Sequence, residues 1–312
     1  MTLTVLFAAD PAEWDDYRPH LTAALAEAGI DAVLTNHVDD PATADYIVFS
    51  PGGTITDFRP YTRAKAVLNL WAGVERIVGN TTLSQPLARM VDPAMTETMV
   101  EYVLGHVLRH HLGMDAHIHG QDGVWRAEMA RPLARDRCVT ILGFGELGQA
   151  VARALIALNF PVRGWSRAPR TVPGVTCFAG EDGIDAALSG AEIVVLLLPR
   201  TAETENTLNA ARLALLAPGA CIINPGRGTL IDDAALIAAL DAGRVSHATL
   251  DVFRVEPLPM DHPFWAHPKI TVTPHIAAQT RPVSSSRVIV ENIVRGEAGL
   301  PFLHLVDRAR GY

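Results

Sequence analysis

The stretch Cys138-Val-Thr-Ile-Leu-Gly-Phe-Gly-Glu-Leu-Gly148 places an apolar run directly before the pattern Gly143-x-Gly145-x-x-Gly148. Residues 147–158 follow with the spacing of an amphipathic helix. In such a strand–turn–helix context the first glycine permits a tight turn, and the second lets the backbone approach a pyrophosphate. The third lets the helix pack closely on the strand. The stretch therefore predicts a dinucleotide site with phosphates at the helix N-terminus, rather than a glycine-rich turn without a ligand.

The segments on either side of this stretch alternate short apolar runs with helical patterns, which indicates α/β folding with parallel strands. Later apolar runs are expected as strands at 162–165, 193–198, 221–223, 248–252 and 270–272. An earlier series at 3–8, 32–35, 46–49 and 66–70 predicts a second sheet, and 96–111 reads as a connecting helix. A final helical stretch at 282–296 is expected to return to the first series.

The predicted fold is thus α/β with two Rossmann-like domains and a cleft between them. Residues 1–97 and 279–312 are expected to form a discontinuous, flavodoxin-like domain, and residues 98–278 a doubly wound dinucleotide-binding domain.

Composition excludes several classes of protein. The chain has 312 residues, of which 49% are hydrophobic and 19% charged, enough for two packed domains. Its 26 Lys and Arg against 34 Asp and Glu give a net charge of −8, which argues against nucleic acid or an anionic membrane as the main partner. A few local arginines can still bind a small anion.

Targeting signals and disulfides are not expected either. The N-terminus has no basic region typical of a signal peptide, and the longest aliphatic runs are far shorter than the ~18–20 residues of a membrane helix. Three scattered cysteines suit neither a disulfide framework nor a zinc site. These observations predict a cytoplasmic protein in a reducing compartment.

The residues after the second strand of the dinucleotide unit bear on the choice of cofactor. An NAD site usually places a carboxylate about 20 residues beyond the glycines, to bind the ribose 2′-hydroxyl. This chain has Trp165-Ser166-Arg167 there, with Arg163 and Arg170 close by and no carboxylate between positions 160 and 170. Arginine and serine suit a 2′-phosphate, which favours NADPH over NADH. A solvated basic turn with relaxed cofactor choice, so that NADH is possible, is the alternative.

Three polar residues lie just beyond later strands, at the edge where open α/β sheets bind ligands. Arg227 lies in Asn-Pro-Gly-Arg-Gly after 221–223, Glu256 follows 248–252, and His275 lies in Thr-Pro-His-Ile-Ala after 270–272. Taken alone, Arg227 suits a solvated loop arginine, Glu256 a surface carboxylate and His275 a structural histidine. Their joint placement beyond a dinucleotide pattern favours an active site.

These segments resemble the NAD(P)-dependent D-2-hydroxyacid dehydrogenase family, most closely its glyoxylate/hydroxypyruvate reductase A type. The resemblance rests on Trp165-Ser166-Arg167, Glu256-Pro-Leu-Pro259, Thr280-Arg-Pro282 and the terminal Val306-Asp-Arg-Ala-Arg-Gly-Tyr312. It covers the second half of the chain and extends more loosely through the first.

The resemblance implies reduction of a small anionic 2-oxo acid, such as glyoxylate or hydroxypyruvate, with NADPH. Arg227 corresponds to the arginine that binds the substrate carboxylate, His275 to the acid/base, and Glu256 to the carboxylate that favours its imidazolium form and orients its ring. It also implies a homodimer, formed through the second domain and its connecting helix.

The remaining site residues are carried over from the same family. The loop that binds the substrate carboxylate through backbone N–H groups corresponds to Trp71, Ala72, Gly73 and Val74, in a substrate-binding first domain. The cofactor-binding set comprises Gly143, Gly145, Glu146, Leu147, Gly148, Trp165, Ser166, Arg167, Leu198, Pro199, Arg200, Thr204, Asn224, Pro225, Gly226 and Asp251.

Some alternatives stay open. Trp71 stands where a small residue is expected, and Pro225-Gly226 departs from the pattern beside the arginine, so the substrate could instead be bulkier, such as phenylpyruvate, or a dicarboxylate such as oxaloacetate. A non-catalytic NADP(H)-sensing protein is a further alternative. His106 and His110 share a helix face, but no glutamate or cysteine completes a ligand set, and no metal site is predicted.

Overall fold

A computed structural model of the chain describes residues 2–125, 132–308 and 311. Ala309, Arg310 and Tyr312 of the C-terminal motif lie outside these ranges. The chain divides into two compact units, one formed by Met1–Met95 with Thr280–Tyr312 and the other by Thr96–Gln279. Both are built on parallel sheets, which confirms the predicted α/β class.

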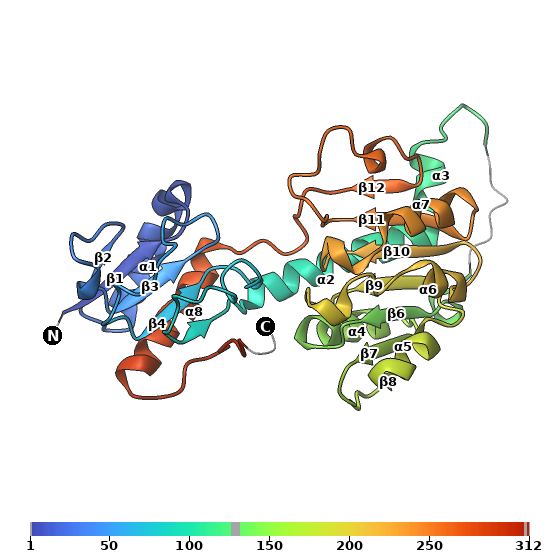
Figure 1. Ribbon diagram of the computed structural model, residues 1–312. Helices are drawn as coiled ribbons and strands as arrows, with labels where there is room; N and C mark the ends of the chain where they lie inside the picture. Colours follow the sequence, from blue (N-terminus) through green and yellow to red (C-terminus); the bar gives the residue numbers. More distant parts are fainter. Residues whose placement is uncertain (1, 126–131, 309–310, 312) are drawn as a thin grey trace. The chain divides into compact units, whose positions relative to one another are not determined.

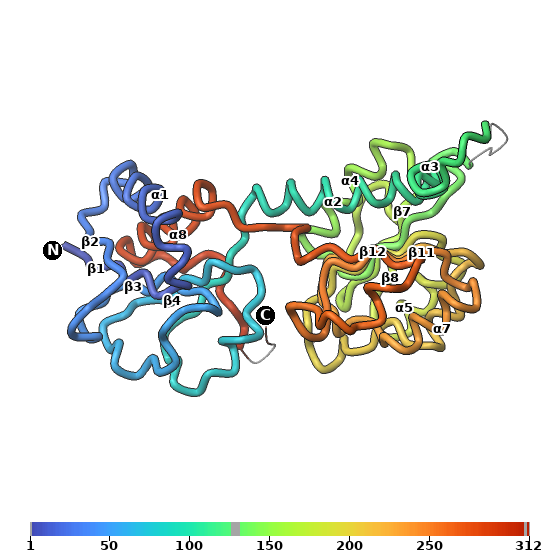
Figure 2. Tube along the Cα trace, turned by 90° about the horizontal axis from the view of Figure 1, so that it is seen from above, coloured from blue at the N-terminus to red at the C-terminus, as the bar shows by residue number. Residues whose placement is uncertain are grey.

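The first unit contains a five-stranded sheet in the order β2-β1-β3-β4-β5, the strand order of flavodoxin-like folds. Its strands are β1 (Leu3–Ala8), β2 (Ala32–Thr35), β3 (Tyr46–Phe49), β4 (Ala66–Asn69) and β5 (Leu87–Ala88). Helices α1 (Trp14–Glu27) and α8 (Pro282–Glu297) pack side by side although they lie at opposite ends of the sequence (Figure 2). The C-terminal helix therefore completes the unit that the N-terminal residues begin.

The second unit contains a seven-stranded sheet in the order β12-β11-β10-β9-β6-β7-β8 (Figure 1). The order reverses at β6, where crossovers leave in opposite directions, as in dinucleotide-binding folds. Its strands are β6 (Val139–Leu142), β7 (Val162–Ser166), β8 (Val175–Ala179), β9 (Ile193–Leu196), β10 (Ala220–Asn224), β11 (Val245–Leu250) and β12 (Ile270–Val272). The α-helices between its strands are α4 (Glu146–Ala157), α5 (Gly180–Leu188), α6 (Ala210–Leu215) and α7 (Asp233–Asp241).

Helix α2 (Pro93–Leu112) precedes this sheet, and the short α3 (Met114–Ile118) follows it directly. Single turns of 3-10 helix occur at Pro11–Glu13, Pro41–Thr43, Ala134–Asp136, Ala202–Thr204, Gly228–Leu230 and Pro263–Trp265. Among the described residues no helix is long and apolar enough to cross a membrane.

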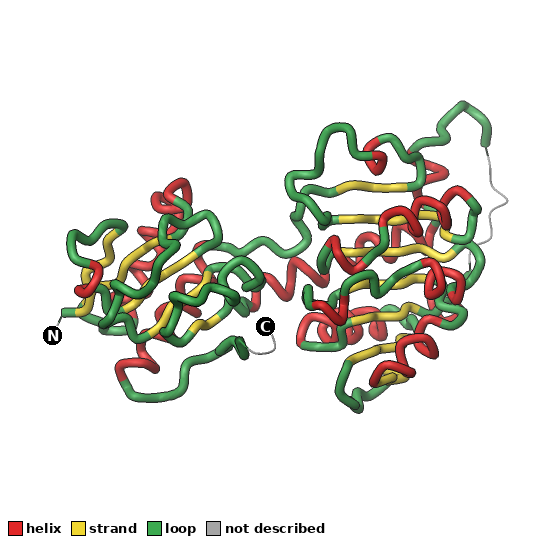
Figure 3. The backbone as a smooth tube through the Cα atoms, viewed as in Figure 1, coloured by secondary structure: helices red, strands yellow, loops and turns green. Residues whose placement is uncertain are grey.

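Strand β9 shows why the central strands are continuously apolar. Successive side chains point to opposite faces of a sheet. Ile193 and Val195 pack with residues of α2 and α4, whereas Val194 and Leu196 pack with residues of α5, α6 and α7. Helices thus cover both faces of the seven-stranded sheet (Figure 3), and this burial on both sides explains the uninterrupted run Ile-Val-Val-Leu.

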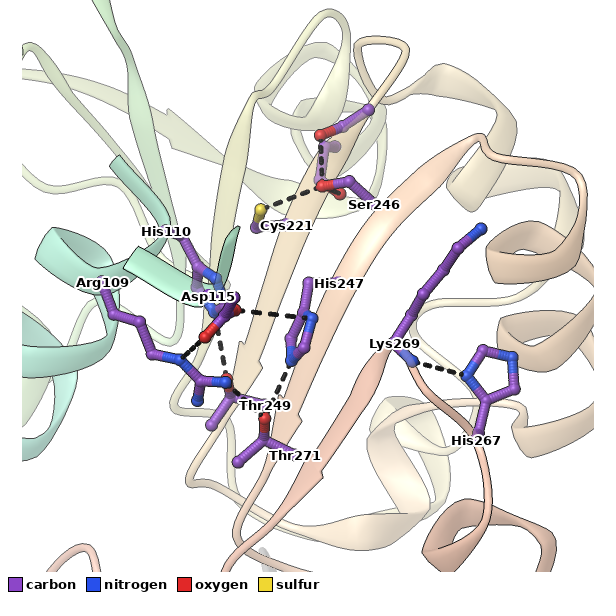
Figure 4. Close-up of polar contacts among 12 residues, drawn as sticks. Arg109, His110, Asp115, Cys221, Ser246, His247, Thr249, His267, Lys269 and Thr271 are labelled. Atoms are coloured by element: carbon purple, nitrogen blue, oxygen red, sulfur yellow. Dashed lines mark hydrogen bonds and ion pairs between the residues drawn. The ribbon is translucent and has the colours of Figure 1, made fainter. Parts of the chain in front are cut away.

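A polar cluster joins α2 and α3 to strands β11 and β12 (Figure 4). Arg109 donates from Nε to Asp115 Oδ1 at 2.6 Å and from its terminal nitrogen to Thr271 Oγ1 at 2.9 Å. His247 Nε2 lies 2.8 Å from the same Thr271 hydroxyl, and His110 Nε2 lies 3.0 Å from Thr249 Oγ1. Burial lowers the pKa of His110 to about 3 and that of His247 to about 4. Among the described residues, no group of three or more His, Cys, Asp or Glu is arranged to hold a metal ion.

These two histidines predict a loss of stability in mild acid. Both stay neutral in the folded protein down to about pH 4, but in the unfolded chain they take up protons near the ordinary pKa of 6.5. The unfolded chain then binds more protons, so the free energy of unfolding falls as the pH drops from 6.5 toward 4. We expect His247→Gln to remove about half of the slope that the two histidines contribute, because glutamine takes up no proton.

Thermal unfolding followed by circular dichroism from pH 4 to pH 7 measures this slope. The control is His37→Gln, whose side chain is 78% exposed, so that folding changes its surroundings little. An unchanged slope in His247→Gln would contradict the prediction.

Candidate active site

The glycine-rich turn leaves β6 at Leu142 and enters α4 at Glu146, with Gly145 as its N-cap residue. Gly143 has φ +103°, and a Cβ there would lie 2.4 Å from the carbonyl carbon of Leu197. A Cβ on Gly148 would lie 2.4 Å from the carbonyl oxygen of Gly143, whereas at Gly145 it would meet no atom within 4 Å. The turn is therefore closed against the sheet and open at Gly145, at the helix N-terminus, which fits the approach of a pyrophosphate.

The carboxyl end of β7 carries Trp165, Ser166 and Arg167, the residues predicted to lie near the 2′-phosphate of the cofactor. Trp165 is fixed by a hydrogen bond from its indole N–H to the carbonyl of Gly180 at 2.8 Å, and the Ser166 hydroxyl donates to the carbonyl of Ala168 at 2.8 Å. Arg167 is exposed beyond the strand. Arg163 lies near the start of the strand and donates to the carbonyl of Ser189 at 2.8 Å. The sequence analysis grouped Arg163 with Arg167 and Arg170. In the structure, Arg163 lies apart from the carboxyl end of the strand, where Arg167 is found.

The loop after β9 is shaped by Thr204, whose hydroxyl donates to the carbonyl of Pro199 at 2.7 Å and accepts from the backbone N–H of Thr201 at 2.8 Å. Leu198 is buried and Arg200 is exposed. Thr204 therefore bonds within the loop itself, and the charged side chains that the loop exposes include Arg200, Glu203 and Glu205.

The loop after β10 is built on the buried side chain of Asn224. Its Oδ1 accepts from the N–H of Gly226 at 3.1 Å, and its Nδ2 donates to the carbonyl of Arg227 at 2.9 Å. The Arg227 guanidinium donates to the carbonyl of Gly226 at 2.7 Å. The Pro225–Arg227 backbone is thus fixed by a side chain from the strand before it.

Glu256 and His275 meet as a hydrogen-bonded pair. His275 Nδ1 lies 2.8 Å from Glu256 Oε2, and Glu256 Oε1 accepts from the N–H of Phe253 at 2.8 Å. A carboxylate only accepts, so Nδ1 carries the proton and Nε2 is the nitrogen left for exchange with a ligand. The histidine side chain is 49% exposed and that of the glutamate 30%.

Electrostatics link Arg227 to this pair. Burial raises the pKa of the Glu256 carboxyl, but hydrogen bonds from His275 and Phe253 lower it, as do the charges of His275 and Arg227. The pKa of Glu256 is lowered overall. The structure therefore brings together the three residues that the sequence singled out at the ends of β10, β11 and β12.

His275 has an unusual backbone conformation, with φ +55°. For a residue other than glycine this left-handed conformation costs roughly 1–2 kcal/mol. Fully buried Asp251 offsets the cost, because its backbone carbonyl accepts from the N–H of His275 at 2.8 Å and its carboxylate accepts from the N–H groups of Ile276 and Ala277, each at 2.9 Å.

Residues 71–74, which lie in the other unit, are held by a side chain that the sequence analysis missed. Asn69, at the end of β4, donates from Nδ2 to the carbonyls of Trp71 at 2.8 Å and Gly73 at 3.0 Å. Val74 is buried and Trp71 is 40% exposed. An asparagine ending an otherwise apolar strand was a usable sequence signal for this role.

Arg254 is a second residue that the sequence analysis missed. It lies in the same loop as Glu256, and its guanidinium donates to the carbonyl of Ile231 at 2.6 Å and to the side chain of Asn206. It also lies 3.6 Å from Asp233. No local pattern predicts these contacts, because the partners are 21–48 residues away in sequence.

Comparison with known proteins identifies the family of this arrangement. Residues 102–277 match the model of the D-isomer specific 2-hydroxyacid dehydrogenase NAD-binding domain. The chain belongs to the D-isomer specific 2-hydroxyacid dehydrogenase family. It is 40% identical over 283 residues to glyoxylate/hydroxypyruvate reductase A of Yersinia enterocolitica, covering 88% of this chain and 89% of that relative.

Solved structures of D-isomer specific 2-hydroxyacid dehydrogenases share the fold over the whole chain. One from Xanthobacter autotrophicus Py2, in complex with NADPH and MES, is 39% identical with a TM-score of 0.91 and full coverage of both chains. The NADPH-dependent glyoxylate/hydroxypyruvate reductase of Sinorhizobium meliloti, in complex with NADP and sulfate, is 32% identical with a TM-score of 0.86 and full coverage of both chains. The resemblance seen in the sequence is thereby confirmed.

Proposed function

We propose that this dehydrogenase uses NADPH to reduce a small 2-oxo acid of the glyoxylate or hydroxypyruvate type to the 2-hydroxy acid. The observation that carries the proposal is the Glu256–His275 pair beside Arg227, at the same sheet edge as an open glycine-rich turn. The relatives named glyoxylate/hydroxypyruvate reductase A support the choice of substrate.

Arg227 and the loop of residues 71–74 are proposed to bind the carboxylate of the substrate. The planar guanidinium suits a carboxylate flanked by a carbonyl, and backbone N–H groups of a tight loop suit an anion. Asn69 would fix that loop through its two hydrogen bonds. The domain predicted at residues 1–97 and 279–312 is therefore proposed to supply substrate contacts, and the domain predicted at residues 98–278 to bind the dinucleotide.

His275 is the proposed proton donor. The nicotinamide of NADPH, when bound, would supply a hydride to the 2-oxo carbon. His275 Nε2 then gives its proton to the developing alkoxide, which becomes the 2-hydroxyl group. Glu256 accepts from Nδ1 throughout, so that Nε2 is the nitrogen that exchanges the proton.

The cofactor is proposed to bind along β6 and β7, with its pyrophosphate at Gly143–Gly148. Ser166 and Arg167 would hold the 2′-phosphate, with Arg200 a further exposed cation on the neighbouring loop. Structural neighbours in complex with NADPH or NADP support this choice.

A reducing, cytoplasmic setting is proposed because Cys138, Cys177 and Cys221 are all free.

The proposal is tested by following NADPH oxidation with glyoxylate, hydroxypyruvate, phenylpyruvate and oxaloacetate. Highest kcat/KM with one of the first two supports it. Preference for phenylpyruvate or oxaloacetate keeps the chemistry and changes the substrate. Tight NADPH binding without turnover on any 2-oxo acid would instead establish a cofactor-sensing protein.

We expect His275→Ala to lower kcat by about 10²–10⁴-fold, because the alkoxide loses its proton donor. NADPH affinity, measured by fluorescence titration, should stay within a few-fold of the parent, and the exposed His37→Ala serves as the control. Undiminished turnover in His275→Ala would exclude this residue as the acid.

We expect Arg167→Gln to raise KM for NADPH by about 10- to 100-fold, because charge-assisted hydrogen bonds to the 2′-phosphate are worth about 1.5–3 kcal/mol. KM for NADH should hardly change, since NADH has no 2′-phosphate. Arg153→Gln, exposed on α4, is the matched control. An unchanged ratio of the two KM values would place the phosphate elsewhere.

A homodimer formed through α2 and α3 is also proposed. Each helix ends on an exposed apolar side chain, with Leu112 of α2 47% exposed and Ile118 of α3 55% exposed. We expect Ile118→Glu to shift the mass measured by light scattering toward the monomer, because a buried charge without a partner is costly. Val33→Glu, at an equally exposed position on the edge strand β2, should leave the mass unchanged. A monomeric parent protein would refute the dimer.

A further inference from the structure

A hydrogen-bonded chain runs from α2 to the segment that carries His275. The hydroxyl of Tyr102 lies 2.7 Å from Thr273 Oγ1, which in turn lies 2.6 Å from Asp251 Oδ1. The Asp251 carboxylate also accepts from the N–H groups of Ile276 and Ala277. Residues on both sides of His275 in the sequence are thus tied to one buried carboxylate.

The direction of each hydrogen bond follows from counting protons. Thr273 has one hydroxyl proton, and it donates that proton to Asp251. The Tyr102 hydroxyl must then donate to Thr273. Burial raises the pKa of Tyr102, so the phenol keeps the proton that this role needs. The chain therefore reads Tyr102 to Thr273 to Asp251, with donors all pointing toward the carboxylate.

We propose that Tyr102 is a positioning residue for His275, acting through Thr273 and Asp251. The left-handed backbone of His275 is unfavourable by itself and persists only where its surroundings hold it. Its N–H bonds the Asp251 carbonyl, and the two residues after it bond the Asp251 carboxylate. Tyr102 fixes the hydroxyl of Thr273, two residues before His275, and so completes the support on that side.

The phenolic oxygen can be tested apart from the packing of the ring. Tyr102 packs against the core between α2 and the sheet, and its ring centroid lies 4.6 Å from that of His106. Phenylalanine retains this packing and removes only the donor to Thr273. Tyr61→Phe is the matched control, since Tyr61 is half-buried against the core of the other unit and is not part of the proposed site.

The inference rests on the proposed function, because its kinetic readout is turnover of a 2-oxo acid. We expect Tyr102→Phe to lower kcat by about tenfold, since small displacements of a catalytic group cost one to two orders of magnitude in rate. KM for NADPH should stay within about twofold. Thr273→Ser, which keeps the hydroxyl, should retain most of kcat, whereas Thr273→Val should lose as much as Tyr102→Phe.

Amide hydrogen exchange gives a readout that needs no activity. The N–H groups of Ile276 and Ala277 should exchange about tenfold faster in Tyr102→Phe and Thr273→Val than in the parent, Thr273→Ser or Tyr61→Phe. The N–H of Val139 in β6, bonded to the carbonyl of Pro161, should exchange at the same rate in all of them.

Each outcome decides one question. Faster exchange at Ile276 and Ala277 together with lower kcat supports the positioning role. Faster exchange with unchanged kcat overturns it, as does a Tyr102→Phe variant that behaves like Tyr61→Phe, or a Thr273→Ser variant as impaired as Thr273→Val. A parent protein without turnover refutes the proposed function, while unchanged exchange still refutes the support by Tyr102.

Discussion

The carboxylate of Asp251 is fully buried at the end of β11 and accepts hydrogen bonds from Thr273, Ile276 and Ala277. A buried charge without such partners would cost several kcal/mol. Because the three donors all belong to the segment after β12, the hydrogen bonds that compensate the charge also fix the course of that segment. The position of His275 follows from this constraint, and the position of Glu256 follows from its bond to His275.

Parallel strand pairing explains why such distant residues converge. The carboxyl ends of β10, β11 and β12 share one edge because each pair is parallel and in register, with Asn224 opposite Leu250 and Leu250 opposite Val272. Loops leaving this edge carry Arg227, Glu256 and His275. This geometry is what made their convergence predictable, since their spacing in the sequence follows the length of one strand and one crossover.

The sequence predicted the elements whose signals are local. The predicted apolar runs became strands and the glycine pattern opened α4, because period and turn chemistry act over a few residues, whereas β5 and β8 were not expected. Contacts that depend on tertiary packing were not predictable in the same way. The guanidinium of Arg163 donates to the carbonyl of Ser189, and the hydroxyl of Tyr102 reaches Thr273 across 171 residues of sequence. In each case the side chain's partner is set by how elements pack rather than by its neighbours in the chain.

Asp251 and Glu256 show how one loop uses two carboxylates differently. Glu256 is partly exposed and accepts one side-chain and one backbone hydrogen bond. Asp251 has no exposure and faces donors at both oxygens. An asparagine there would turn its own N–H groups toward one set of those donors, leaving a buried donor unsatisfied at about 1–3 kcal/mol. The charge at Asp251 therefore serves to hold the segment, whereas the pair beside it stays open to solvent.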